Sequence, residues 1–222
     1  MGSVDQQFPS AIIYDWDNTI VDTWPVIIRA MNATLMAMGH SSWNDEEAKK
    51  RIRKSLRTSF PALFGPSWAK ARGIFYEHIR ENHLSQLKIL HGAEKLINGV
   101  SVMGIPQFVL SNKVDSILQS EVQYLGWQRF FSRVVGAEVA PNDKPHTDAV
   151  RYTLSGTGIG VSSDVWFVGD TAIDMECAFN SGLFGVAVRP FSDKDQEFDV
   201  FLPQLHFDSP EALWTFISSK RQ

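Results

Sequence analysis

The sequence predicts an α/β protein: a doubly wound, Rossmann-like parallel sheet with an inserted all-helical domain. Three observations support this fold class. A short apolar run near the start of the chain breaks off into carboxylates at Asp15 and Asp17. The stretch from about residue 24 to 90 shows helical patterns alone. After it, short β-rich runs alternate with helical ones, which is typical of a parallel sheet joined by crossover helices.

Composition disfavours several other classes of protein. Of the 222 residues, 44% are hydrophobic and 21% are charged, which disfavours a disordered or fibrous chain. The net charge of -4 disfavours a general nucleic-acid binder, because such a protein neutralises many phosphates with a basic face. No stretch approaches the ~18 consecutive apolar residues that span a bilayer, and the single cysteine, Cys177, excludes an intrachain disulfide. We therefore expect a cytoplasmic protein with no nucleic-acid and no membrane partner, and the choice between monomer and dimer stays open.

The opening run, Ile12-Ile13-Tyr14, is expected to form a buried strand. Its β-branched residues fit the interior of a parallel sheet. Open α/β sheets carry their functional groups at the carboxyl ends of strands. Asp15 and Asp17 follow this strand at once, so we expect both at that edge of the sheet. Trp16 alternates with them and is expected to pack into the core.

Three helices are expected in the insertion. Pro25 is typical of a first helical turn, and this helix should end near residue 39. A second helix begins near residue 43 with acidic residues and turns basic within two turns, the order that the helix dipole favours. It should end before Pro61, because proline disrupts helix interiors. A third helix is expected from about residue 66 to 82.

Further strands and helices are expected after this insertion. The strands cover residues 107–111, 133–136, 165–169 and 184–188, and the helices lie near residues 93–103, 113–125, 145–156, 172–181 and 210–219. The sheet that the opening strand begins is thus resumed after the helical stretch. A helical insertion within one doubly wound domain is the simplest topology that explains this order. We therefore expect a core domain of residues 1–22 and 92–222 and an inserted domain of residues 23–91.

Polar residues follow the expected strands in a characteristic order. They are Asp15-Trp16-Asp17-Asn18-Thr19, then Ser111-Asn112-Lys113, then Lys144-Pro145 before a helix, and finally Gly169-Asp170-Thr171-Ala172-Ile173-Asp174. This order resembles the four motifs of the haloacid dehalogenase (HAD) superfamily. The first motif, the helical insertion straight after it and Gly169-Asp170-Thr171 resemble the phosphoglycolate phosphatase-like branch. Asn18 stands where glycine is common, and asparagine can adopt the same left-handed turn.

The resemblance implies that the core carries the chemistry and that the insertion is a helical cap. Asp15 would be the nucleophile that takes up a phosphoryl group. Asp17 would first protonate the leaving alkoxide and then activate water. Ser111 would donate its hydroxyl to phosphate, with amide support from Asn112. Lys144 would hold phosphate and nucleophile together as a point charge.

A Mg²⁺ cofactor is implied by the resemblance and fits the charge of these residues. The family pattern places Asp15, the backbone carbonyl of Asp17 and Asp170 as ligands, with Asp174 among the ligands or just behind them. If Asp15, Asp170 and Asp174 are ionised, each pair ~4 Å apart repels by about 4 kcal/mol at an effective dielectric near ~20. Lys144 alone cannot offset this repulsion, whereas a hard divalent cation on carboxylate oxygens can.

The leaving group is expected to be recognised by the insertion, since the core motifs contact phosphate alone. A basic segment there contains Arg53, Lys54 and Arg57 and resembles the substrate-specificity loop of helical caps. We expect one of these side chains to meet an anionic leaving group such as a carboxylate. A solvated basic helix end is the alternative. Trp24 is expected to line the substrate cavity, with packing between cap and core as its alternative.

The resemblance thus implies a Mg²⁺-dependent phosphatase that hydrolyses a small-molecule phosphate monoester, phosphoglycolate-like, through an aspartyl-phosphate. Asp17 disfavours haloalkanoate dehalogenation and phosphonoacetaldehyde hydrolysis, because those enzymes use no acid-base aspartate at that position. A phosphomutase of the β-phosphoglucomutase type stays open, since it keeps both carboxylates and transfers the phosphoryl group to a second hydroxyl. A catalytically silent binding protein is the alternative from another class. The sequence does not rank individual phosphate esters.

Overall fold

The computed structural model describes residues 8–52, 56–190 and 197–220, with the backbone alone for residues 56–58. The chain divides into two compact units. The first unit comprises Met1–Val21 and Ile89–Gln222, and the second unit comprises Asp22–Lys88. At the two chain crossings, the short strands β2 (Val21–Asp22) and β3 (Lys88–Ile89) pair as a two-stranded sheet. The chain therefore leaves and re-enters the first unit at adjacent points.

A six-stranded parallel sheet forms the centre of the first unit, in the order β5-β4-β1-β6-β7-β8. Parallel sheets are buried on both faces, and β1 and β6 are accordingly buried at every residue. The predicted α/β class with a parallel sheet is confirmed, and one short strand, β8, was not predicted. The strands are β1 (Ala11–Tyr14), β4 (Gln107–Val114), β5 (Arg133–Ala137), β6 (Val165–Gly169), β7 (Phe184–Val188) and β8 (Leu205–Phe207).

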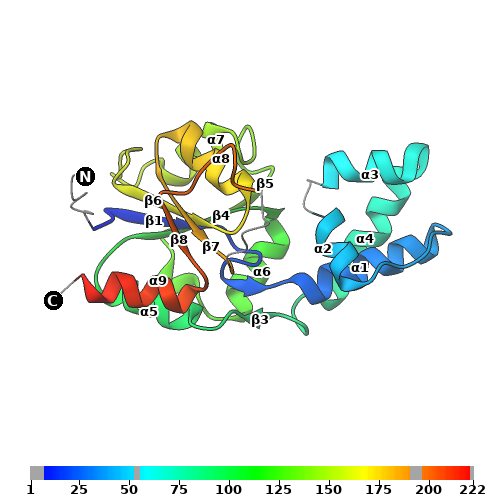
Figure 1. The fold of residues 1–222 in the computed structure, drawn as a ribbon, viewed down its shortest axis with the longest axis horizontal. Helices are drawn as coiled ribbons and strands as arrows, with labels where there is room; N and C mark the ends of the chain where they lie inside the picture. The colour runs from blue at the N-terminus through cyan, green and yellow to red at the C-terminus, as the bar shows by residue number, and fades with distance from the viewer. Residues whose placement is uncertain (1–7, 53–55, 191–196, 221–222) are drawn as a thin grey trace. The chain divides into compact units, whose positions relative to one another are not determined.

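Helices cover both faces of this sheet (Figure 1). On one face, helices α7 (Thr147–Leu154) and α8 (Ala172–Ser181) bury apolar side chains such as Cys177 against Phe167 of β6. On the other face, α5 (Ala93–Val102) lies beside α9 (Pro210–Ser219). Helix α6 (Asp115–Tyr124) follows β4 and packs against β4 and β5. The sheet is therefore doubly wound, as the alternating pattern indicated.

Strand β1 lies where the strand order reverses, between β4 and β6. Its last residue, Tyr14, is in register with Val109 of β4 and Val168 of β6. The polar residues at the carboxyl ends of these three strands therefore collect at one edge of the sheet. Ligands of open parallel sheets bind at such a reversal point, outside the carboxyl ends of the strands.

Strand β4 continues past its predicted end at residue 111. It runs to Val114, but its pairing with β5 shifts register between Leu110 and Val114. The segment of Ser111, Asn112 and Lys113 lies within this irregularity. Irregularities of this kind re-aim side chains near active sites, and these three are the polar residues that the sequence placed at this edge.

The second unit is helical in the residues that the structure describes between its linking strands. Its helices are α1 (Trp24–Ala37), α2 (Asp45–Arg51), α3 (Leu56–Phe64), a 3-10 turn (Gly65–Ser67) and α4 (Trp68–Asn82). Helix α1 packs along α4. The Asn44 side chain accepts a hydrogen bond from the Glu47 N–H at 2.8 Å and so caps α2. The predicted helical insertion is confirmed.

The sequence predicted that a helix ends before Pro61. In the structure Pro61 instead lies inside α3. The preceding helix, α2, ends already at Arg51. A proline in a helix interior removes one backbone hydrogen bond and costs about 3 kcal/mol. Phe60 and Phe64 make an edge-to-face contact with each other, and Phe60 makes another with Phe75 of α4. Packing of these rings offsets the cost and keeps the segment helical.

None of the helices in the described residues is both long and apolar enough to cross a bilayer. The longest of them, α4, has 15 residues, against the roughly 20 that a membrane span needs.

Candidate active site

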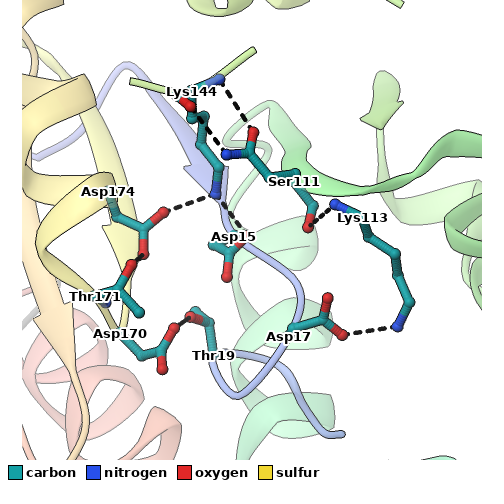
Figure 2. Close-up of polar contacts among 10 residues, drawn as sticks. Asp15, Asp17, Thr19, Ser111, Lys113, Lys144, Asp170, Thr171 and Asp174 are labelled. Atoms are coloured by element: carbon teal, nitrogen blue, oxygen red, sulfur yellow. Dashed lines mark hydrogen bonds and ion pairs between the residues drawn. The ribbon is translucent and has the colours of Figure 1, made fainter. Parts of the chain in front are cut away.

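Asp15 follows β1 directly and is held by a buried lysine. The Nζ atom of Lys144 donates to Oδ1 of Asp15 at 2.6 Å and to Oδ1 of Asp174 at 2.7 Å (Figure 2). All three residues are buried. They come from the end of β1, the loop before α7 and the first turn of α8. Three segments far apart in the sequence thus meet in one ion-paired cluster.

Asp174 also closes the N-terminus of α8. Its Oδ2 accepts hydrogen bonds from the backbone N–H and the hydroxyl of Thr171, at 3.0 and 2.7 Å. This arrangement is a capping box, which satisfies N–H groups that a helix start leaves unpaired. Gly169, at the end of β6, is required by the packing, because a Cβ there would stand 2.3 Å from Cγ of Asp174. The helix start and the ion pair with Lys144 therefore fix both oxygens of Asp174.

Asn112 anchors the backbone that carries the Lys144 ammonium. Its side-chain amide donates to the Lys144 carbonyl oxygen at 2.9 Å and accepts from the Lys144 N–H at 3.1 Å. Ser111 is buried, and its hydroxyl oxygen accepts from the Lys113 N–H at 3.3 Å. The structure thus gives Asn112 a positioning contact that the sequence did not predict. Contacts of Ser111 and Asn112 with phosphate stay predictions.

The turn after Asp17 brings a buried threonine next to Asp170. Asn18 has a φ of 59°, the left-handed conformation expected from the sequence. Thr19 is fully buried and donates to Oδ1 of Asp170 at 3.3 Å. On its other side, the Asp170 carbonyl oxygen accepts from Arg189 at 3.2 Å. These contacts hold Asp170 beside the cluster that Lys144 organises.

Excess negative charge marks this cluster. Burial raises the pKa of Asp15 to about 7; the Lys144 ammonium opposes the rise, and the charge of Asp174 adds to it. Burial, with the charges of Asp174 and Asp15, also raises the pKa of Asp170 well above its usual value. Burial alone would lower the pKa of Lys144, but Asp15 and Asp174 raise it. One ammonium therefore lies among three carboxylates, and two of them, Asp15 and Asp170, bind their protons more tightly than exposed aspartates do.

The same three carboxylates fit a hard divalent cation. Asp15, Asp170 and Asp174 each offer one oxygen, and these oxygens all lie within 4.8 Å of one another. A donor set of carboxylate oxygens is the kind that Mg²⁺ prefers. A cation bound there would balance the charge that Lys144 leaves uncompensated. The charge argument made from the sequence therefore has a geometric counterpart in the structure.

Asp17 is held by a second, partly buried lysine. The Nζ atom of Lys113 donates to Oδ1 of Asp17 and to Oε2 of Glu121, both at 2.7 Å. Burial alone would lower the pKa of Lys113, but Asp17 and Glu121 raise it. Trp16 is fully buried, as predicted, and its Nε1 donates to the same Glu121 oxygen at 2.7 Å. The Asp15 and Asp17 side chains thus belong to two different ion-paired groups.

Sequence reasoning assigned no role to Lys113 or Glu121. A signal existed for Lys113, because it follows Ser111 by two positions and residues two apart in a strand share a face. Glu121 carries no such signal. It lies on α6, where an acidic side chain would ordinarily be exposed, yet it is fully buried.

The cap residues predicted to bind substrate belong to the second unit. Trp24 is the first residue of α1, and the Nζ of Lys49 lies 5.8 Å from the centroid of its ring. Arg53 and Lys54 lie outside the described residues. Arg57 belongs to α3, but its side chain also lies outside the described part. Contacts of these four residues with a substrate stay predictions.

A family model decides the relationship of the chain to known proteins. Residues 12–188 match the model of the haloacid dehalogenase-like hydrolases, a stretch that contains every motif residue from Asp15 to Asp174. The chain belongs to this family. The resemblance drawn from the four motifs is therefore confirmed, and the matched stretch contains the charged cluster at the end of β1.

Individual relatives are distant in sequence and close in fold. A phosphoglycolate phosphatase from Xanthomonas campestris pv. campestris (strain 8004) is 23% identical over 185 residues, which are 82% of this chain and 83% of that protein. A haloacid dehalogenase-like family hydrolase from Streptococcus pneumoniae has a TM-score of 0.82 at 20% identity, covering 97% of this chain and 99% of that one. A HAD-superfamily hydrolase of subfamily IA from Geobacter sulfurreducens PCA has a TM-score of 0.71 at 19% identity, covering 96% and 100%.

Proposed function

We propose that this protein is a Mg²⁺-dependent phosphatase that hydrolyses a small-molecule phosphate monoester of the phosphoglycolate type. The observation that carries the proposal is the buried cluster in which Lys144 joins Asp15 to Asp174 beside Asp170. Asp17, two residues after Asp15, provides the carboxyl group that the proposal uses for acid-base chemistry on a phosphate ester. Membership of the hydrolase family and the distant phosphoglycolate phosphatase relative support the reaction class.

Asp15 is the proposed nucleophile. One of its oxygens forms a bond to phosphorus while the bond from phosphorus to the ester oxygen breaks, which gives an aspartyl-phosphate and an alkoxide. Lys144 fixes the orientation of the carboxylate through Oδ1. The same ammonium would lie beside the phosphate oxygens and neutralise part of their charge. Ser111 would donate its hydroxyl to another phosphate oxygen.

Asp17 is the proposed proton carrier. In the first half-reaction its carboxyl proton passes to the leaving alkoxide oxygen. In the second, the carboxylate takes a proton from the water that attacks phosphorus, and the bond between phosphorus and Asp15 breaks. Inorganic phosphate leaves, Asp15 returns to a carboxylate and Asp17 returns to the protonated form. The two half-reactions therefore balance without another acid or base.

Mg²⁺ would be held by the carboxylates of Asp15 and Asp170 and by the backbone carbonyl of Asp17, with Asp174 beside them. When bound, it supplies positive charge against the phosphate and the carboxylates. Among the protein residues, Lys144 orients the nucleophile Asp15, and Asp17 is the acid-base group.

Removal of divalent cations is expected to lower hydrolysis of p-nitrophenyl phosphate at least ~100-fold, because a bound cation contributes several kcal/mol to charge stabilisation. Initial rates measured in EDTA and after restoring Mg²⁺ test this. Mg²⁺ should also raise the thermal unfolding midpoint of the unmodified protein, since a ligand that binds only the folded state stabilises it. The shift in midpoint should shrink in an Asp170→Asn variant. Equal rates and equal midpoints with and without Mg²⁺ would contradict the metal site.

A panel of phosphate esters with product analysis tests the function itself. The panel should contain phosphoglycolate, nucleoside monophosphates and sugar phosphates, with free phosphate and sugar-phosphate isomers measured separately. Release of phosphate supports a phosphatase. Isomer formation without phosphate release would instead indicate a mutase of the β-phosphoglucomutase type. A protein that produces neither, with or without Mg²⁺, would be a silent binding protein.

The second unit is the proposed cap, and its basic segment is proposed to recognise the leaving group. Arg57→Ala or Arg53→Ala is expected to raise KM for phosphoglycolate about tenfold and to leave that for p-nitrophenyl phosphate within about twofold, because a hydrogen bond to a charged group contributes roughly 1.5–3 kcal/mol. Arg80→Ala, at an exposed arginine in α4, is the matched control. Unchanged kinetics for acidic and neutral esters alike in both variants would contradict the proposal.

A further inference from the structure

Each aspartate of the first motif has its own lysine, Lys144 buried and Lys113 partly buried, and each lysine is anchored by a second, buried carboxylate. Lys144 joins Asp15 to Asp174, and Lys113 joins Asp17 to Glu121 (Figure 2 shows both aspartates and both lysines). The side chain of Lys113 is 9% exposed and that of Glu121 is not exposed at all, against 24% for Asp17. The buried Glu121 carboxylate therefore holds the Lys113 side chain, and the Lys113 ammonium also meets the more exposed side chain of Asp17.

Glu121 supports Asp17 by two routes. It accepts the Lys113 ammonium, and through the same oxygen it accepts the indole N–H of Trp16 at 2.7 Å. Trp16 stands between Asp15 and Asp17 in the chain and packs edge-to-face against Trp127 and Phe131. One carboxylate on α6 thus fixes both the backbone that leads to Asp17 and the cation that meets its side chain.

Stability alone does not account for this group. A buried ion pair commonly gives little net stability, because removing both charges from water costs about as much as their attraction returns. What the arrangement does supply is orientation. The terminal torsion of an aspartate has broad, nearly twofold wells, so a contact to Oδ1 alone decides which oxygen is turned away from Lys113. In Figure 2 the second oxygen of Asp17 is turned away from the Lys113 ammonium.

We propose that Lys113, anchored on Glu121, is a positioning residue that holds Asp17 in the orientation from which it protonates the leaving group. The inference rests on the proposed function. In the step concerned, the bond between Asp15 and phosphorus forms, the bond from phosphorus to the ester oxygen breaks, and the proton of Asp17 passes to that oxygen. Lys113 takes no part in bond making or breaking and acts through the geometry of Asp17 alone.

The leaving group provides a test that separates positioning from folding. A p-nitrophenolate leaves without a proton, whereas an alkoxide needs one, and kcat/KM reports only the steps up to release of the leaving group. In Lys113→Met, kcat/KM for an alkyl ester should fall about 100-fold and that for p-nitrophenyl phosphate less than about fivefold, because general acid catalysis contributes roughly 10²–10⁴-fold. The alkyl probe is 2-phosphoglycolate or β-glycerophosphate, whichever the unmodified protein hydrolyses faster.

Matched variants exclude a merely structural effect. Lys113→Arg keeps a charged donor and should recover most of the alkyl-ester activity. Lys95→Met makes the same change at an exposed lysine of α5 and should alter neither kcat/KM value. If Lys113→Met fails to fold because Glu121 loses its cationic partner, Lys113→Met with Glu121→Gln removes both charges and keeps an acceptor for Trp16. That double variant should show the same selective loss on the alkyl ester.

Two results would overturn the inference while leaving the proposed function intact. One is an equal loss on both probes in the folded variants, and the other is no loss on the alkyl ester. Failure of the proposed function is recognised separately, because the unmodified protein would then hydrolyse neither probe. In that case the inference falls with it.

Discussion

Asparagine in place of Asp15 is expected to reduce hydrolysis of p-nitrophenyl phosphate by at least ~10⁴-fold, the size of effect seen when a covalent nucleophile is removed. The change is nearly isosteric, and the amide oxygen can still accept the Lys144 hydrogen bond that Oδ1 of Asp15 accepts. The amide lacks the charge needed to attack phosphorus, so the shape of the site is kept while the aspartyl-phosphate cannot form.

Two measurements test this expectation. Steady-state rates give the loss of turnover, and intact-protein mass after acid quenching shows whether a phosphoryl group is carried on the protein. Asp164→Asn is the matched control, since it makes the same chemical change at an exposed residue before β6. It should leave both turnover and phosphorylation unchanged. Unimpaired turnover in Asp15→Asn would refute the nucleophile assignment.

Methionine in place of Lys144 is expected to reduce the free energy of unfolding by about 3 to 5 kcal/mol in the absence of divalent cations, because breaking a buried ion pair on one side leaves its partner charge uncompensated. Lys144 is the cation that Asp15 and Asp174 share, and all three are buried. Turnover should fall as well, since the same ammonium orients Asp15 and would neutralise phosphate charge.

A double variant separates the two effects of losing Lys144. Removing the ammonium makes the net charge of the cluster more negative by one, and Asp174→Asn takes away one of the two carboxylates that Lys144 pairs with. Lys144→Met with Asp174→Asn should therefore recover most of the stability in a urea titration without recovering turnover. Mg²⁺ should also raise the stability of the single variant. A Lys144→Met variant as stable and as active as the unmodified protein would contradict this account.

The predicted strands and the four motifs followed from local patterns. An apolar run that breaks into carboxylates marks a strand end wherever it lies, and the carboxyl ends of parallel strands meet at one edge of the sheet. For this reason Asp15 and Asp170 were expected at one edge of the sheet, and the motif resemblance added Lys144 and Asp174. The structure places Lys144 in contact with Asp15 and Asp174, and oxygens of the three aspartates lie within 4.8 Å of one another. The left-handed turn at Asn18 is another local property, and it too was predictable.

Other features depended on contacts that a local pattern does not contain. Pro61 stays helical because Phe60 packs on Phe75 of a different helix. Strand β8 is only three residues long and owes its existence to pairing with β7. Asn112 turned out to clamp the backbone of Lys144, a residue that lies beyond the whole of α6 and β5 in the chain.

The sequence by itself therefore predicted the fold class from the alternation of strands and helices, and it predicted the family and the residues of the charged cluster from the resemblance of four motifs in order along the chain. The tertiary structure alone decided that a second lysine, Lys113, meets Asp17. Pairing of Lys113 with Asp17 depends on the register shift in β4 and on the face of α6 that buries Glu121. Register and helix rotation are set by packing across the sheet, and no spacing within one segment encodes them.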